Sequence, residues 1–123
     1  MRIVCIGGGT GMFTILSCLR HECPTAHLSA VVSMMDSGGS TGRLRDEYGY
    51  LPPGDVRKCL VALSRAPVKL RGLMEYRFPT GELKGHSFGN LMLTAFKGTI
   101  NGNAEEKEYK AIEAMEEILN IQG

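Results

Sequence analysis

Residues 2–11 read RIVCIGGGTG, and this stretch decides the fold class of the chain. The run over 2–6 is short, apolar and β-branched, which is typical of a strand buried on both faces of a parallel sheet. Glycines follow directly, and apolar residues then recur at helical spacing up to about Arg20. A second strand is expected over 28–34 (LSAVVSM). Residues 2–34 are therefore predicted to form one β-α-β unit.

The rest of the chain is predominantly helical in pattern. Helices are expected over 56–65, about 69–77, 88–97 and 103–119. Asp55, Ser87 and Asn103 are the expected N-caps, and Gly98 is the expected C-terminal stop of the helix that starts at Ser87. Two strands cannot cover so many apolar helix faces. The sequence thus predicts a Rossmann-like parallel three-layer α/β/α sandwich, with 1–123 forming a single, incomplete domain that is its N-terminal half.

The composition of the chain makes some classes of function improbable. The chain has 123 residues, 43% apolar and 22% charged, with a net charge of +1. It has no run long enough to span a membrane, and its charge gives no reason to expect a nucleic-acid partner. The segment 103–123 holds six Glu and two Lys, which leaves +5 on the remainder, a balance that favours phosphorylated or acidic ligands. Four cysteines without a CxxC pair indicate reduced, mostly buried thiols of a cytoplasmic protein: Cys5, Cys18, Cys23 and Cys59.

The first candidate site is the glycine loop. It consists of Gly7, Gly8, Gly9, Thr10 and Gly11. Between a strand and a helix, glycines let the backbone approach a phosphate while the helix start offers free N–H groups. The loop matches the dinucleotide pattern only in part, because Met12 stands where the third glycine is needed. Phosphate or nucleotide binding is favoured over a merely tight turn, and a nicotinamide-dependent oxidoreductase is disfavoured.

A second polar loop follows the second strand. It begins with Asp36 and continues with Gly38, Gly39, Ser40, Thr41, Gly42 and Arg43. Backbone N–H groups, hydroxyls and a guanidinium group together are typical of an anion cradle. The alternative is a flexible polar loop with solvated arginines.

Two further motifs add polar side chains. In LPPGD (51–55), Asp55 is either a helix cap or a carboxylate that faces Asp36, in which case the two could hold one Mg²⁺. In GHSFGN (85–90), polar side chains at a helix start either form another wall of the same crevice or serve the fold alone. These side chains are His86, Ser87 and Asn90.

Taken in order and spacing, GGGTG, DSGGSTGRLR, LPPGD and GHSFGNL resemble the CofD/YvcK superfamily. The resemblance covers nearly the whole chain and points to the gluconeogenesis-factor branch. It implies a Rossmann-like fold with a ligand crevice at the carboxyl ends of the strands. In the transferase branch, a guanylyl-activated phospholactate donates its phospholactyl group to a deazaflavin hydroxyl with Mg²⁺, and Asp36 and Asp55 correspond to the metal-binding carboxylates.

The chain departs from the family in two respects. The family often has paired aspartates where this chain has Asp36 and Ser37, which weakens the metal prediction. Family members are also longer, and their next strand typically begins just after the position of Gly123. The expected partners are therefore a small-molecule nucleotide ligand together with either a missing C-terminal half or further copies of the chain.

The first hypothesis is a regulatory protein that binds a nucleotide diphosphate, with a UDP-sugar favoured. The resemblance links this branch to carbon metabolism, cell shape and cell-wall synthesis. The second hypothesis is a Mg²⁺-dependent phospholactyl transferase of coenzyme F420 synthesis, with a GDP-type donor. The sequence leaves open whether any reaction is catalysed.

Overall fold

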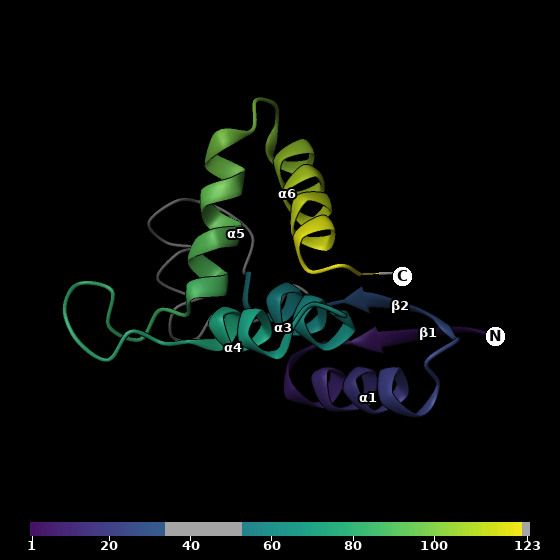
Figure 1. Ribbon diagram of the computed structural model, residues 1–123. Coiled ribbons are helices and arrows are strands. Elements are labelled where there is room, and N and C mark those ends of the chain that lie inside the picture. Colours follow the sequence, from purple (N-terminus) through teal and green to yellow (C-terminus); the bar gives the residue numbers. More distant parts are fainter. Residues whose placement is uncertain (34–52, 122–123) are drawn as a thin grey trace.

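The computed structural model describes residues 1–33 and 53–121 (Figure 1). Its elements in chain order are β1 (Arg2–Gly7), α1 (Gly9–Glu22), β2 (His27–Val32), α3 (Pro53–Leu63), α4 (Val68–Glu75), α5 (Phe88–Thr99) and α6 (Ala104–Ile118). Within these ranges no helix is both long enough and apolar enough to cross a bilayer.

The predicted β-α-β unit is confirmed. β1 and β2 pair in parallel, from Arg2 opposite His27 to Gly7 opposite Val32, with α1 as the connection. The helices α1 and α3 pack side by side on one face of this sheet. Buried side chains of both helices meet the sheet there: Met12, Leu16, Cys59 and Ala62, packed against Cys5, Ala30 and Val32. The α/β class with parallel strands and the Rossmann-like fold are thus as expected.

The opposite face of the sheet is exposed in the part of the chain that the structure describes. Val4 is 62% exposed, Ile6 80% and Val31 54%. Their register places Ile6 opposite Val31, so the three side chains form one apolar surface. Parallel sheets normally have both faces covered. The described residues therefore supply two of the three predicted layers.

An apolar cavity of about 390 Å³ lies between β2, α3 and α6. Its lining is Ser29, Ala30, Val32, Val56, Cys59, Leu60, Leu63, Ile112 and Glu116. The interior of a complete domain is close-packed. The cavity and the bare sheet face both agree with the expectation of an incomplete domain.

Two of the expected helix caps are confirmed and two expected ends are wrong. Ser87 Oγ accepts from Asn90 N at 3.1 Å, and Asn103 Oδ1 accepts from Glu106 N at 2.9 Å. Asp55 is not an N-cap, since α3 already begins at Pro53, and proline is well suited to a first helical turn. Gly98 does not stop α5, which continues to Thr99.

The helices α5 and α6 form an antiparallel pair that stands away from the sheet (Figure 1). Its apolar core joins that of α3 through buried Leu93, Met115 and Leu119. An ion pair also links the two helices: Lys97 Nζ lies 2.6 Å from Glu108 Oε1. The lysine side chain is fully buried and that of Glu108 is 12% exposed.

The bare sheet face yields a first testable expectation. Exposed apolar surface weakens stability by about 25 cal/mol per Å² left in water. The isolated chain should therefore bind a hydrophobic dye, and the double variant Ile6→Thr/Val31→Thr should bind less dye without unfolding. Dye fluorescence and sedimentation velocity measure this. A dye-silent, cooperative monomer that melts above about 60 °C would instead identify these residues as a self-sufficient domain.

Candidate functional site

The glycine loop joins the carboxyl end of β1 to the start of α1. Gly7 is the last residue of the strand and has a φ of +157°. Gly8 precedes the helix in an extended conformation, without a side chain to cap it. The first turn of α1 also carries no acidic residue. The start of α1 thus has neither a capping side chain at Gly8 nor an acidic residue of its own first turn, an arrangement that suits an anion.

Asp55 lies directly beside this loop. A Cβ atom placed on Gly8 would be 3.3 Å from Asp55 Oδ2 and 3.3 Å from Ser33 Cβ. Ser33 itself donates its N–H to the Gly7 carbonyl at 2.7 Å, which fixes the chain just beyond β2 against the loop. The Asp55 residue is only 6% exposed. The structure therefore brings together two predicted site elements that are more than forty residues apart in the sequence.

The Asp55 charge also affects a thiol of the core. The pKa of Cys59 is raised to about 11 by burial, by the carboxylate of Asp55 and by Cys5, in that order. Cys59 is the buried thiol among four free cysteines, whereas Cys18 is exposed and Cys5 and Cys23 are half-buried. The expectation of mostly buried core thiols holds for Cys59 and in part for Cys5, which packs against the same core cluster, and it is wrong for the exposed Cys18. A thiol held protonated in this way is a packing group and not a nucleophile.

The GHSFGN motif forms the start of α5. His86, Ser87 and Asn90 are each at most 3% exposed. Ser87 caps the helix, as described above, and the backbone of His86 accepts from the N–H of Phe78 at 3.1 Å. These contacts give the motif a role in the fold, and ligand binding by its side chains stays a prediction.

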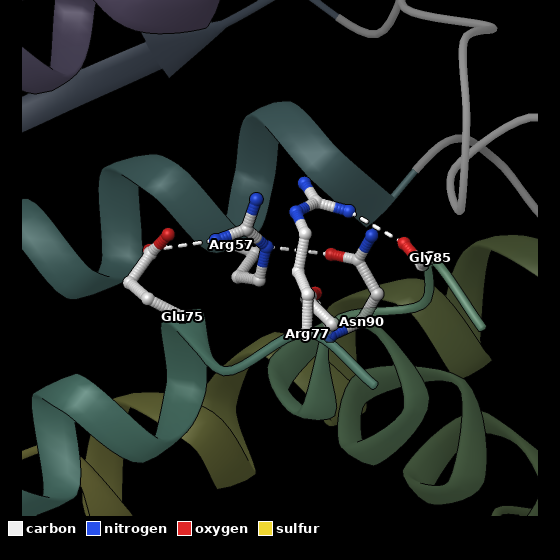
Figure 2. A network of polar contacts seen from close by, with 6 residues as sticks. Arg57, Glu75, Arg77, Gly85 and Asn90 are labelled. Carbon is white, nitrogen blue, oxygen red and sulfur yellow. Dashed lines mark hydrogen bonds and ion pairs between the residues drawn. The ribbon is translucent and has the colours of Figure 1, made fainter. Parts of the chain in front are cut away.

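Arg57 connects α3 to this motif, a link that the sequence does not suggest. Its Nε donates to Asn90 Oδ1 at 2.7 Å, and its Nη1 lies 2.6 Å from Glu75 Oε1 in an ion pair poorly aligned for a hydrogen bond. Figure 2 shows the guanidinium group between these two partners, with Arg77 nearby donating to the Gly85 carbonyl. Because Arg57 follows Asp55 by two residues, the Asp55 turn and the start of α5 are held in a fixed relation.

Gly89 makes this link sterically possible. A Cβ atom there would lie 2.6 Å from the Met74 carbonyl oxygen and 2.7 Å from Arg57 Cδ. Both distances are well below ordinary van der Waals contact. The second glycine of GHSFGN therefore serves the close approach of α3, α4 and α5.

The other predicted site residues lie outside the described ranges. These are Asp36, Gly38, Gly39, Ser40, Thr41, Gly42 and Arg43. Among the described residues, no group of three or more His, Cys, Asp or Glu side chains could hold a metal ion. Asp55 alone still fits Mg²⁺ beside a phosphate, because this ion is often held by one or two carboxylates, phosphate oxygens and water. The shared site with Asp36 stays a prediction.

Comparison with known proteins decides the family. A family model described as 2-phospho-L-lactate transferase CofD matches residues 3–123. The chain belongs to the CofD family. This agrees with the resemblance that its four motifs carry.

Relatives in this family include proteins named as gluconeogenesis factors. The chain is 47% identical to one from Nostoc sp. over 123 residues, which are 99% of this chain and 25% of the relative. It is 45% identical to one from Thermotoga maritima, with 100% and 37% covered, and 40% identical to the gluconeogenesis factor of Listeria monocytogenes, with 99% and 36% covered. The chain thus spans between a quarter and somewhat more than a third of the length of these CofD relatives.

Solved structures show the same fold. A UPF0052-family protein from Bacillus halodurans matches 99% of this chain and 38% of its own, with a TM-score of 0.86 and 40% identity. A second structure of the protein from this organism gives a TM-score of 0.84 at 38% identity. At such identity the likeness extends to sequence as well as fold.

Proposed function

We propose that this chain carries the phosphate-binding part of a nucleotide-diphosphate site, with a UDP-sugar as the favoured ligand and regulation as its role. The observation that carries the proposal is the position of the buried Asp55 carboxylate directly beside the glycine loop, 3.3 Å from where a Cβ atom of Gly8 would lie. Family membership and the relatives named gluconeogenesis factors support the family to which the proposal refers. The ligand and the role are inferred from the residues and motifs of this chain. A role in carbon metabolism, cell shape or wall synthesis belongs to the same proposal.

The negative charge of Asp55 would affect how such a ligand binds. A carboxylate next to a phosphate repels it, and a divalent cation between the two groups removes the repulsion. Diphosphate binding at this loop should therefore be stronger with Mg²⁺ than without it. Replacing Asp55 by Asn should reduce that dependence on Mg²⁺.

The second candidate is a phospholactyl transferase, favoured by the name of the family model that matches. Mg²⁺ held by Asp55 would supply charge neutralisation to the donor phosphates. The loop at Gly8 would position the diphosphate, and the N-terminus of α1 would offset its charge. A GDP-type ligand bound in preference to a UDP-sugar would favour this candidate.

The test is a calorimetric titration of the chain with UDP-glucose and with GDP, each with and without Mg²⁺. Gly8→Val places a branched side chain where a Cβ already meets Asp55 and Ser33 at 3.3 Å. We expect this variant to lose affinity at least about tenfold, equivalent to about 1.4 kcal/mol.

The matched control is Gly72→Ala, because a Cβ on this α4 glycine meets no atom within 4 Å. It should bind like the original chain. Equal affinity of the Gly8→Val variant would exclude the loop from the site, and failure of the original chain to bind either nucleotide would contradict the proposal for these residues.

A further inference from the structure

A second group of basic side chains gathers at the far end of α1 from the glycine loop. Arg20 and His21 lie in the last turn of α1, and Arg65 follows the end of α3. Together with Pro24 they line an open cavity of about 340 Å³. Because α1 has 14 residues at about 1.5 Å each, this cavity lies about 20 Å from the loop at Gly8.

Arg20 and Arg65 each bind the backbone of the segment that carries the other arginine. Arg20 Nη1, from α1, donates to the Ser64 carbonyl beyond α3. Arg65 Nη2 donates in the reverse direction, to the Pro24 carbonyl beyond α1, at 2.9 Å. Ser64 is fixed in turn, since its Oγ donates to the Leu119 carbonyl at 2.7 Å. The two guanidinium groups are therefore oriented before any ligand arrives, which reduces the entropy lost on binding.

A third arginine adds charge to this corner. Arg71 Nε donates to the Ala66 carbonyl at 3.2 Å. The pKa of Arg20 is lowered by burial first and then by the positive charges of Arg71 and Arg65. The three groups thus repel one another, and an anion between them would remove that repulsion.

The described residues do not supply that anion. Within 1–33 and 53–121, no carboxylate forms an ion pair with Arg20, Arg65 or Arg71. Glu22, on the same turn as Arg20, pairs with His21 Nδ1 at 2.9 Å, and both of these side chains are mostly exposed.

Contacts with carbonyl groups explain only part of the cluster. Cations are favourable at helix C-termini, which accounts for Arg20 at the end of α1. A guanidinium group carries five N–H donors, however, and each of the three arginines uses one nitrogen for its carbonyl contact. Forked donors remain, and these match the oxygens of a phosphate group.

We propose that Arg20 and Arg65, with Arg71 beside them, form a second anion site for a small phosphate-bearing molecule, separate from the glycine loop. Its position at the amino ends of the strands makes it independent of the nucleotide site proposed above. The excess positive charge outside residues 103–123 agrees with it.

The probe is inorganic pyrophosphate, titrated without Mg²⁺ into the Gly8→Val chain so that the loop does not contribute. Amide shifts in a two-dimensional NMR spectrum locate the binding, at constant ionic strength adjusted with chloride. We expect shifts at Arg20, His21 and Arg65, and a loss of affinity of at least about tenfold in Arg65→Gln. Arg71→Gln, which leaves the cavity lining intact, should lose less.

The matched control is Arg77→Gln. Arg77 is likewise exposed and likewise donates to a carbonyl, that of Gly85 at 2.7 Å, but it lies outside the cluster. Its replacement should leave pyrophosphate affinity within about twofold. If Arg77→Gln and Arg65→Gln lost affinity equally, or if chloride abolished binding, pyrophosphate would be responding only to the general positive charge of the surface. Either result would overturn the proposal. Shifts absent from residues 20–24 and 64–66 would overturn it as well.

Discussion

Replacing Lys97 by methionine should lower the free energy of unfolding by about 3–5 kcal/mol. The reason is the partner it leaves behind: Glu108 would lose its cation in a site where its side chain is only 12% exposed. Its Oε2 atom already lacks a hydrogen-bond partner among the described residues. Removing one member of a buried pair strands the other charge, and this is far more damaging than losing a surface pair. Urea denaturation followed by circular dichroism measures the change.

The double variant Lys97→Met/Glu108→Leu separates this cause from lost packing. With both charges gone, most of the stability should return, because apolar side chains of similar size can replace a buried ion pair. The exposed pair of His21 and Glu22 is the matched control, and Glu22→Gln should change stability by less than about 0.5 kcal/mol. A double variant as unstable as Lys97→Met would show that shape, not charge, makes this position sensitive.

The second large effect is expected at Gly89, where alanine should destabilise the chain by about 3 kcal/mol. The added methyl group would overlap the Met74 carbonyl oxygen and the Arg57 side chain, at 2.6 and 2.7 Å. A backbone oxygen cannot rotate away as the end of a side chain can. The α4–α5 contact must therefore open, or Arg57 must leave its position between Glu75 and Asn90.

Gly98→Ala on the same helix provides the comparison. A Cβ atom at Gly98 meets nothing within 4 Å, so alanine there should be neutral or stabilise the helix by up to about 1 kcal/mol. Thermal melts of the two variants test the difference. Similar melting temperatures would mean that α5 shifts easily, and that the link between Arg57 and Asn90 is weaker than its geometry indicates.

Local patterns were sufficient to predict the β-α-β unit and two of the three N-caps. RIVCIGGGTG is a short apolar run followed by glycines, and apolar residues at helical spacing come directly after it, so no distant contact is needed to interpret it. Ser87 and Asn103 cap helices through hydrogen bonds that reach only three residues along the chain. The wrong ends also have local causes. Asp55 is a typical N-cap residue, but Pro53 fits a first helical turn and α3 begins there. Gly98 is typical of a helix end, but α5 continues through it to Thr99.

Contacts between distant segments could not be predicted in this way. The sequence indicated that Asp55 belongs to a site, but its closeness to Gly8 depends on how α3 packs on α1. Nothing in the sequence around Arg57 distinguishes it from an exposed arginine on a helix. Only the packing of α4 and α5 gives it Glu75 and Asn90 as partners. A single sequence carries no signal for such pairs.

The difference in thiol reactivity between Cys18 and Cys59 can be used to measure how often the core opens. At a given pH, a pKa near 11 instead of 9.0 leaves Cys59 with about a hundredfold less thiolate, and it is also shielded from reagents. Cys18 is exposed on α1 and should be alkylated without any opening of the core. The delay between the two reactions therefore reports how often α1 and α3 separate, and a ligand held at Gly8 and Asp55, where these helices begin, would lengthen it.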